Sequence, residues 1–230
     1  NQHVGNFPGV TVDKKEGSIR RHPEATVTDL PGIYSLSPYT LEEVVSRDYL
    51  LKEKPDVIID LVDATNIERN LYLATQLLEI GIPVVIALNM VDLLKKNNIH
   101  INVKGLSSAL GCPIVETSAL KGTGLKEVVD EAIKCANQHR VPSKQMEFPK
   151  AVEKAVNEIE GFVPANIAEE NKRWYAVKLL ERDSKVKEGL NLPASAQSRI
   201  EEIASGLEKA EDDDTESIVC LLYTSPSPRD

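Results

Sequence analysis

The chain has 230 residues with 27 Lys and Arg and 36 Asp and Glu, a formal net charge of -9 and a pI near 5.1. This length suits one large domain, or one medium domain and a small one. The acidic balance argues against a nucleic-acid surface as the main partner, because phosphate binding needs clustered Lys and Arg.

The cysteines and the hydropathy pattern exclude further classes of protein. Cys112, Cys135 and Cys220 are widely spaced and form no CxxC motif or Cys/His set, which argues against a disulfide framework or a zinc site and fits a reducing compartment. The longest apolar runs have about the length of a strand, well short of the roughly 18 residues that cross a bilayer, and no signal-peptide pattern opens the chain. The sequence therefore predicts a soluble protein.

Both ends of the chain indicate a fragment. The chain starts without Met in a loop-like stretch, residues 1–9, so we expect that a preceding strand and helix have been cut away. The last stretch, residues 220–230, becomes rich in Ser and Pro, which indicates a non-native tail.

The first 140 residues alternate predicted strands with predicted helices. Short runs of β-branched and aliphatic residues predict strands at residues 10–19, 25–30, 56–64, 83–92 and 113–117. Helical periodicity and capping boxes at 40–43 and 65–68 predict helices at residues 41–52, 67–80, 103–110 and 125–136. In the first of these helices we expect Leu41, Val44, Val45 and Leu51 to face the core. The alternation predicts an α/β fold with a mainly parallel sheet, right-handed crossovers and helices on both faces.

The character of the sequence changes after His139. Residues 141–149 read as a linker that contains Pro142, and the rest reads as helices only, at residues 151–160, 167–181 and 200–211. This pattern predicts a small all-α domain over residues 150–219, in which Trp174 is a core anchor.

The run at residues 83–92 ends in two polar side chains, Asn89 and Asp92. In open α/β sheets, ligands bind at the carboxyl ends of the strands. A carboxylate there can accept two parallel hydrogen bonds from a ring N–H and an exocyclic amine, a pattern that guanine offers and adenine does not. Asp92 is thus a candidate base reader, although Asn and Asp are also ordinary turn residues after a strand.

A second motif, Asp29-Leu30-Pro31-Gly32, ends the strand at residues 25–30. It offers a carboxylate for a metal-bound water and a Gly whose N–H can approach a phosphate closely, because no Cβ intervenes. The same four residues also suit a plain turn.

Taken in order, Thr11 and the motifs at residues 29–32, 89–92 and 117–120 match the second to fifth signature loops of a GTPase. The sequence resembles the N-terminal cytoplasmic part of the ferrous iron transport protein B family, FeoB, over about residues 1–219. The resemblance rests on residues 4–17, 28–43, 63–79, 87–92 and 173–183. The last of these lies in the helical part, which resembles that family's guanine-nucleotide dissociation inhibitor domain.

The resemblance implies a truncated G domain over residues 1–140 that binds GTP or GDP with Mg²⁺. Thr11 would bind the Mg²⁺ and the γ-phosphate, Asp29 would hold the Mg²⁺ through water, and the Gly32 N–H would meet the γ-phosphate. Asn89 would brace the base loop and Asp92 would read guanine. The implied GTP-binding residues are Gly9, Val10, Thr11, Val12, Asp13, Asp29, Leu30, Pro31, Gly32, Asn89, Met90, Val91, Asp92, Ser118, Ala119 and Leu120.

Some of these residues have particular roles in the implied pocket. Met90 replaces the Lys that covers the base in other GTPases, and its thioether can supply the apolar part of that contact. Ser118 and the Ala119 N–H would complete the guanine pocket. Hydrolysis would be in-line attack of water on the γ-phosphoryl group, but the loop after Asp29 has no water-positioning Gln, so no catalytic residue is assigned.

The sequence also departs from the GTPase pattern in its phosphate-binding loop. No Gly in the chain is followed by Lys, so the phosphate-binding loop G-x-x-x-x-G-K-[ST] is absent. That loop supplies much of the phosphate affinity. We therefore expect a GTPase in the parent protein and impaired nucleotide binding in this fragment.

The resemblance also implies a parent protein that regulates Fe²⁺ uptake at the cytoplasmic face of the bacterial inner membrane. Its partners would be its own transmembrane permease domain, a small FeoA-type protein and further copies of itself, with no nucleic acid. The four His and three Cys do not cluster, so we expect no Fe²⁺ site in the fragment.

Two alternatives remain open. One is a soluble GTPase of another class, for example in ribosome assembly, against which the acidic balance and the motif at residues 173–183 count. The other is an interaction module that has kept the fold and lost nucleotide binding.

Overall fold

The computed structural model describes residues 2–7, 13–36, 40–139, 148–211 and 214–215. The chain divides into two compact units, Asn1–Lys54 and Pro55–Asp230. The predicted tail, residues 220–230, and most of the predicted linker lie outside the described residues.

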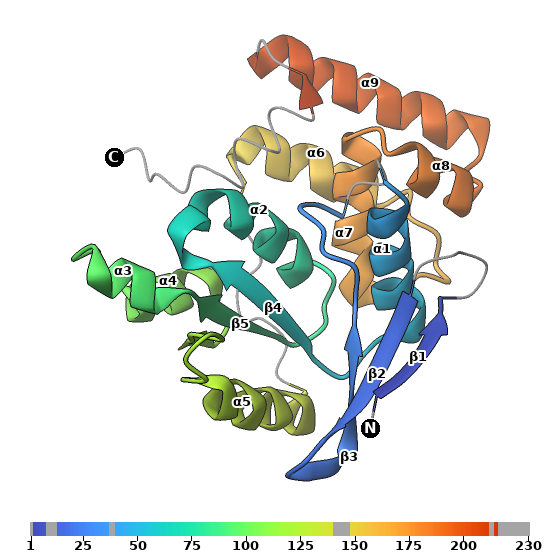
Figure 1. Cartoon of the computed structure of the whole chain (residues 1–230). Helices are drawn as coiled ribbons and strands as arrows, with labels where there is room; N and C mark the ends of the chain where they lie inside the picture. The colour runs from blue at the N-terminus through green and yellow to red at the C-terminus, as the bar shows by residue number, and fades with distance from the viewer. Residues whose placement is uncertain (1, 8–12, 37–39, 140–147, 212–213, 216–230) are drawn as a thin grey trace. The chain divides into compact units, whose positions relative to one another are not determined.

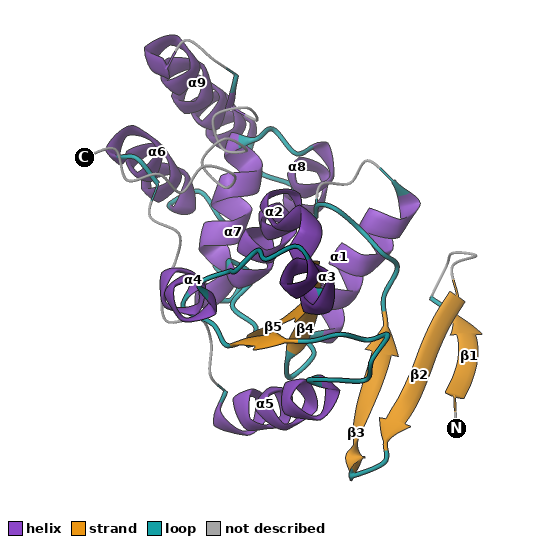
Figure 2. Ribbon diagram, turned by 60° about the vertical axis from the view of Figure 1, so that its left-hand side comes forward, coloured by secondary structure: helices purple, strands orange, loops and turns teal. Residues whose placement is uncertain are grey.

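The first unit contains a three-stranded antiparallel sheet, in which β1 (Gln2–Asn6), β2 (Asp13–Ile19) and β3 (His22–Asp29) lie in that order (Figure 2). The prediction of a loop over residues 1–9 is wrong for β1. Only Val4 in this strand is β-branched, and the strand forms because all five of its residues pair with β2. Such long-range pairing leaves no local pattern in the sequence.

The helix of the first unit, α1 (Leu41–Glu53), begins with the predicted capping box. Thr40 Oγ1 accepts the Glu43 N–H at 3.2 Å, and the Glu43 carboxylate accepts the Thr40 N–H at 2.9 Å. The core-facing prediction is confirmed for Val45 and wrong for Leu41, which is 47% exposed. Leu41 is the first residue of α1, so its side chain, which points back toward the helix N-terminus, has no earlier turn of α1 to pack on.

The second unit contains the predicted parallel sheet, with β4 (Ile58–Asp63), β5 (Val84–Asn89) and β6 (Ile114–Glu116) in that order. Helices α2 (Ile67–Leu78) and α5 (Leu125–Gln138) lie on opposite sides of β4 and β5 (Figure 1). Residues 84–88 are all buried, as expected for a central parallel strand that is covered on both faces.

The connections after β4 and β5 differ from their predictions. The capping box at residues 65–68 does not form, because Asp63 at the end of β4 caps a 3-10 turn, Ala64–Asn66, by accepting the Thr65 N–H at 2.8 Å. After β5, Met90 adopts a left-handed conformation with φ of 64° and starts the unpredicted helix α3 (Val91–Lys96). Helix α4 (Val103–Leu110) has the predicted bounds and ends at Gly111.

The C-terminal part is helical, as predicted, with α6 (Lys150–Glu160), α7 (Glu169–Leu180), α8 (Ser184–Leu190) and α9 (Ala194–Glu211). Trp174 on α7 is 2% exposed and is the largest fully buried side chain in the described part of the chain, which confirms it as a core anchor. The short helix α8 was not predicted. It is capped by Asp183, whose carboxylate accepts the Val186 N–H at 3.0 Å.

The part of the chain that the structure describes holds neither a membrane span nor a metal cluster. Within residues 2–7, 13–36, 40–139, 148–211 and 214–215, no helix combines the length and the apolar character needed to cross a bilayer. Over the same ranges, no three His, Cys, Asp or Glu side chains lie together in a way that could hold a metal ion.

Candidate functional site

Two parallel strands, β5 and β6, bring the predicted base-loop residues together. The strands are direct neighbours in the sheet, so the segments that follow their carboxyl ends lie at the same edge. The Thr117 N–H donates to the Leu88 carbonyl at 2.8 Å, and the Val91 N–H donates to the Thr117 carbonyl at 3.3 Å. The two segments are thereby joined through their backbones.

Asn89, the last residue of β5, ties the second segment down. Its Oδ1 accepts the Ala119 N–H at 3.0 Å and the Thr117 hydroxyl at 3.3 Å. One side-chain oxygen thus fixes residues on a segment that lies about 30 positions later in the sequence. Because the Ala119 N–H already has an acceptor, its donation to a base oxygen requires that this N–H be shared or that Asn89 move.

Asp92 lies in the first turn of α3, beside the same loop. Its Oδ2 lies 3.3 Å from the Lys121 Nζ, and its side chain is 16% exposed. The Ser118 hydroxyl and then the Lys121 ammonium lower the pKa of Asp92, against the opposing effect of its partial burial. The carboxylate is therefore ionised at neutral pH and can only accept hydrogen bonds.

The Ser118 hydroxyl, which is the first cause of the lowered pKa of Asp92, is buried in the base loop. Ser118 is 2% exposed, and its Oγ makes no hydrogen bond of standard geometry to any described residue. A buried hydroxyl without a partner is unfavourable, so this group can gain from a ligand or a water.

The turn that carries Ser118 is held tightly. Ser118 and Thr123 exchange two backbone hydrogen bonds, of 3.1 and 3.2 Å. Gly124 has φ of 76°, and a Cβ at this position would lie 2.1 Å from the Glu116 carbonyl oxygen, so only Gly fits. The sequence reasoning missed both Gly124 and Lys121, although the run of residues 120–124, Leu-Lys-Gly-Thr-Gly, carries the turn signal.

Two apolar side chains of the predicted site are exposed. Met90 is 40% exposed and Leu120 is 92% exposed. Met90 lies two residues before Asp92, and Leu120 directly follows Ala119. An ionised carboxylate on a loop that also carries exposed apolar side chains fits a purine base that carries N–H donors on one edge.

The predicted phosphate and metal residues belong to the first unit or lie outside the described part. Gly9, Val10, Thr11 and Val12 lie outside the described residues. Asp13 is the first residue of β2 and Asp29 is the last residue of β3, followed by Leu30. The Pro31 carbonyl accepts the Ser46 hydroxyl at 3.3 Å.

Gly32 has no steric reason to be glycine within the described residues. A Cβ added there would meet no atom within 4 Å. Close approach by a phosphate, as the sequence implied, is a reason that lies outside the protein's own packing.

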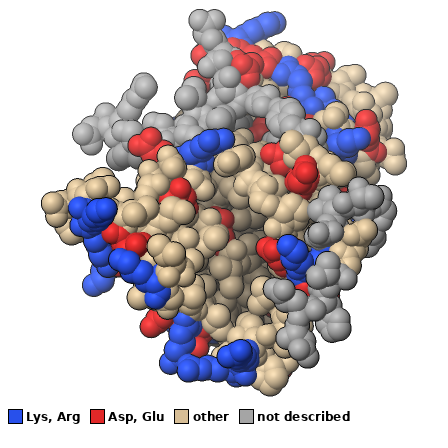
Figure 3. Space-filling view, viewed as in Figure 1, with Lys and Arg blue, Asp and Glu red and all other residues tan. Residues whose placement is uncertain are grey.

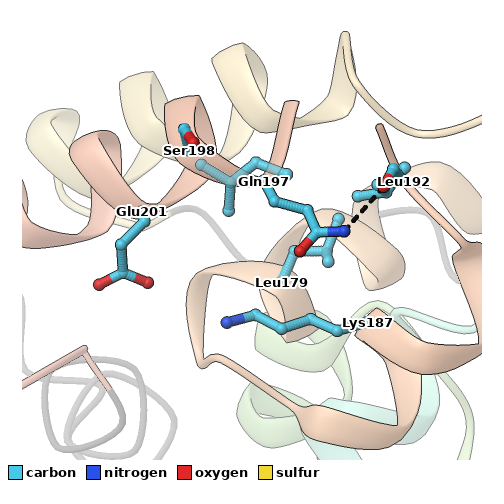
Figure 4. A pocket seen from close by; sticks show the side chains of 7 residues that line it. Leu179, Lys187, Leu192, Gln197, Ser198 and Glu201 are labelled. Carbon is cyan, nitrogen blue, oxygen red and sulfur yellow. Dashed lines mark hydrogen bonds between the residues drawn. The ribbon is translucent and has the colours of Figure 1, made fainter. Parts of the chain in front are cut away.

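A separate pocket of about 320 Å³ lies among α7, α8 and α9 (Figure 4). Its walls carry Lys187, Glu201 and apolar side chains, and the Gln197 side-chain amide donates to the Leu192 carbonyl at 2.7 Å. None of the predicted nucleotide-binding residues lines it. Elsewhere, the face drawn in Figure 3 shows acidic and basic side chains intermixed.

Comparison with known proteins identifies relatives for both parts of the chain. Residues 1–132 match the family model described as "Ferrous iron transport protein B", and residues 148–220 match "FeoB cytosolic helical domain". The Fe(2+) transporter FeoB of Escherichia coli (strain K12) is 40% identical over 191 residues, which cover 79% of this chain and 24% of the transporter. The chain thus spans about a quarter of the length of the curated relatives it matches.

Solved structures are also similar to this chain. An S. thermophilus NFeoB mutant bound to mGDP has 45% sequence identity and a TM-score of 0.91, over 97% of this chain and 86% of that chain. An S. thermophilus NFeoB mutant bound to GMPPNP has 44% identity and a TM-score of 0.85, over 97% of this chain and 87% of that chain.

Proposed function

Because the chain belongs to the ferrous iron transport protein B family, we propose that it is the GTP-binding cytoplasmic module of a ferrous iron membrane transporter. The observation that carries the proposal is the ionised Asp92 carboxylate beside a braced loop at the carboxyl ends of β5 and β6. This is the edge at which α/β sheets bind ligands, and an acceptor-only group there selects guanine over adenine.

The proposed roles follow the groups that each residue offers. Asp92 accepts the ring N–H and exocyclic amine of guanine, Asn89 holds the loop, and Met90 and Leu120 contact the faces of the base. Ser118 and Ala119 complete the pocket, where the buried Ser118 hydroxyl has no hydrogen bond of standard geometry and can take up an added polar group. Val91 contributes its backbone to the same loop.

The phosphate and metal roles are proposed for the first unit. Thr11 and, through water, Asp29 hold a Mg²⁺ ion, and Gly32 with Leu30, Pro31 and residues 9–13 lines the phosphates. Carboxylate and hydroxyl oxygens are ligands that Mg²⁺ prefers, usually with several waters retained. When bound, the Mg²⁺ neutralises charge that develops on the transferred phosphoryl group.

In the longer protein, we propose GTP hydrolysis to GDP and phosphate that regulates Fe²⁺ uptake at the cytoplasmic face of the bacterial inner membrane. Its transmembrane permease domain, a FeoA-type protein and other copies of itself are the proposed partners. We also propose the domain division inferred from the sequence: G domain at 1–140, linker at 141–149, helical domain at 150–219 and non-native tail at 220–230.

Calorimetry with GDP, GTP and ATP tests the base reader. It is applied to this chain and to a longer protein that contains it, each also as Asp92→Ala and, as a control, Asp130→Ala, a change to an exposed carboxylate on α5. We expect guanine nucleotides to bind in preference to ATP, with binding lost in Asp92→Ala and kept in Asp130→Ala. We expect weaker binding by the 230-residue chain, in which no Gly is followed by Lys.

Two results would contradict the proposal. Equal binding of GDP and ATP would remove Asp92 as the base reader. Absence of guanine binding in every folded protein tested would favour the interaction module that has lost nucleotide binding.

A further inference from the structure

The carboxylate that is proposed to read guanine is paired with one of the protein's own lysines. The Lys121 Nζ lies 3.3 Å from the Asp92 Oδ2, and the two side chains are 59% and 16% exposed. An ammonium group offers three N–H donors and no acceptor. The edge of guanine that meets a carboxylate also offers only N–H donors, so Lys121 satisfies Asp92 with the same kind of group.

The backbone that carries Lys121 is fixed, while its side chain can move. The Lys121 N–H donates to the Ser118 carbonyl at 3.1 Å, and the Gly122 N–H donates to the Ala119 carbonyl at 3.3 Å. Beyond this turn, the Lys stem has four carbons and its ammonium is largely solvated. The ammonium can therefore leave Asp92 without unfolding the loop.

We propose that Lys121 competes with the guanine base for Asp92 and so limits how long a guanine nucleotide stays bound. This inference rests on the proposed function of Asp92 as the base reader. As guanine enters, the Lys121 ammonium gives up or shares the Asp92 Oδ2, and as guanine leaves, the ammonium returns to it. An exposed ion pair contributes little, so the competition changes affinity by a small factor and weakens as salt screens the pair.

A pair of lysine substitutions separates this role from a general effect of charge. Lys121→Met keeps the length of the apolar stem and removes the ammonium. Lys126→Met makes the same change on α5, where the Lys126 side chain is 62% exposed and its Nζ lies 3.8 Å from the Asp130 Oδ2. Both lysines carry the same charge at similar exposure, and only Lys121 contacts the proposed base reader.

The experiment measures the dissociation constant and dissociation rate of fluorescently labelled GDP at about 0.05 M and about 0.5 M salt. The longer protein that contains this chain is used as wild type, Lys121→Met and Lys126→Met, with ADP as the competitor that tests base selectivity and thermal unfolding as a check on folding. We expect Lys121→Met to bind GDP about twofold to fivefold more tightly and to release it more slowly at low salt. This difference should shrink at high salt, and Lys126→Met should match the wild type.

The outcomes separate the inference from the function on which it rests. If the wild type binds GDP selectively and folded Lys121→Met binds it equally well or more weakly, the competition is refuted and the base reader stands. A gain in affinity of Lys121→Met that does not depend on salt would also refute the competition and leave the base reader in place. If the folded wild type does not bind GDP, the proposed function fails and the inference falls with it.

Discussion

The buried carboxylate of Asp60 on β4 makes the stability of the protein depend on pH in an unusual direction. Asp60 is 8% exposed, and its Oδ2 has no hydrogen-bond partner among the described residues. Burial raises its pKa from 3.8 to about 7. Cys112 lies near Asp60, and burial, with Asp60 and Cys135 nearby, raises the pKa of Cys112 to about 12. Cys112 therefore stays neutral between pH 4 and pH 8.

The sign follows from the raised pKa of the folded state. Between about pH 4 and about pH 7 the folded protein keeps a proton on Asp60 that the unfolded chain has lost, so the free energy of unfolding falls as the pH rises. At about 1.4 kcal/mol for each pKa unit, the rise from 3.8 to about 7 corresponds to a loss of up to about 4 kcal/mol. The loss is complete above pH 7, where both states are ionised.

Asp60→Asn removes this ionisation and keeps the shape of the side chain. We expect the variant to be about 2 to 3 kcal/mol more stable than the wild type at pH 8, somewhat below the full value because the amide N–H groups also lack partners. At pH 4 we expect no gain. Urea unfolding at pH 4, 6 and 8 measures the difference.

Asp63→Asn is a matched control on the same strand, with the opposite sign. Partial burial acts to raise the pKa of Asp63, but hydrogen bonds from Thr65 and Asn66 outweigh this effect and lower it. The stability that ionised Asp63 contributes is therefore present above its unfolded pKa and is lost as the pH falls through its folded pKa. We expect Asp63→Asn to be less stable than the wild type at pH 8. A stability difference for Asp60→Asn that is the same at pH 4 and pH 8 would refute the ionisation argument.

Three further predictions concern the base loop and the helical part. Arg173 donates to the buried Glu79 at 3.1 Å and to Glu153 at 2.7 Å. Arg173→Met should therefore lower the free energy of unfolding by about 3 kcal/mol, whereas Arg199→Met, which removes an exposed ion pair, should change it little. Equal losses of stability in urea unfolding would contradict this prediction. Gly122→Ala should lower the free energy of unfolding by about 1 kcal/mol because of the positive φ alone. Gly124→Ala should lower it clearly more, because the added Cβ meets the Glu116 carbonyl. The reverse order of stability in thermal unfolding would refute this contact. Trp174→Ala should cost about 3 to 5 kcal/mol from the cavity it leaves, measured by urea unfolding, and a cost below about 1 kcal/mol would show that the site collapses.

The parts of the fold with a strong local pattern could be predicted from the sequence. The continuous apolar run of β5 and the periodic apolar face of α6 need no knowledge of their partners, because burial on both faces or on one face already sets the pattern. Strand β1 could not be predicted, because its one β-branched residue gives no local signal and it forms by pairing with β2, a separate segment further along the chain. Helices α3 and α8 have 6 and 7 residues, too few to show a helical period.

The same division applies to the candidate site. The position of Asp92 just after a buried strand could be predicted, since the strand and its polar end are adjacent in sequence. The pairing of Asp92 with Lys121 could not be predicted, because the two residues lie 29 positions apart with a further strand between them. The parallel pairing of β5 with β6 brings the segments that carry these side chains to the same edge of the sheet.

Folding alone accounts for some residues of the base loop and leaves others unexplained. Asn89, Thr117 and Gly124 each satisfy a hydrogen bond or a close approach within the loop, so the fold requires them whether or not a ligand binds. The side chains of Met90 and Leu120 differ: both are apolar and exposed, and their burial in the free protein contributes little. Exposed apolar side chains gain stability when an apolar face covers them, and an ionised carboxylate on the same loop accepts N–H donors. A purine base with the donor pattern of guanine meets both conditions, and for this reason the residues that the fold does not explain add to the support that Asp92 gives the proposed site.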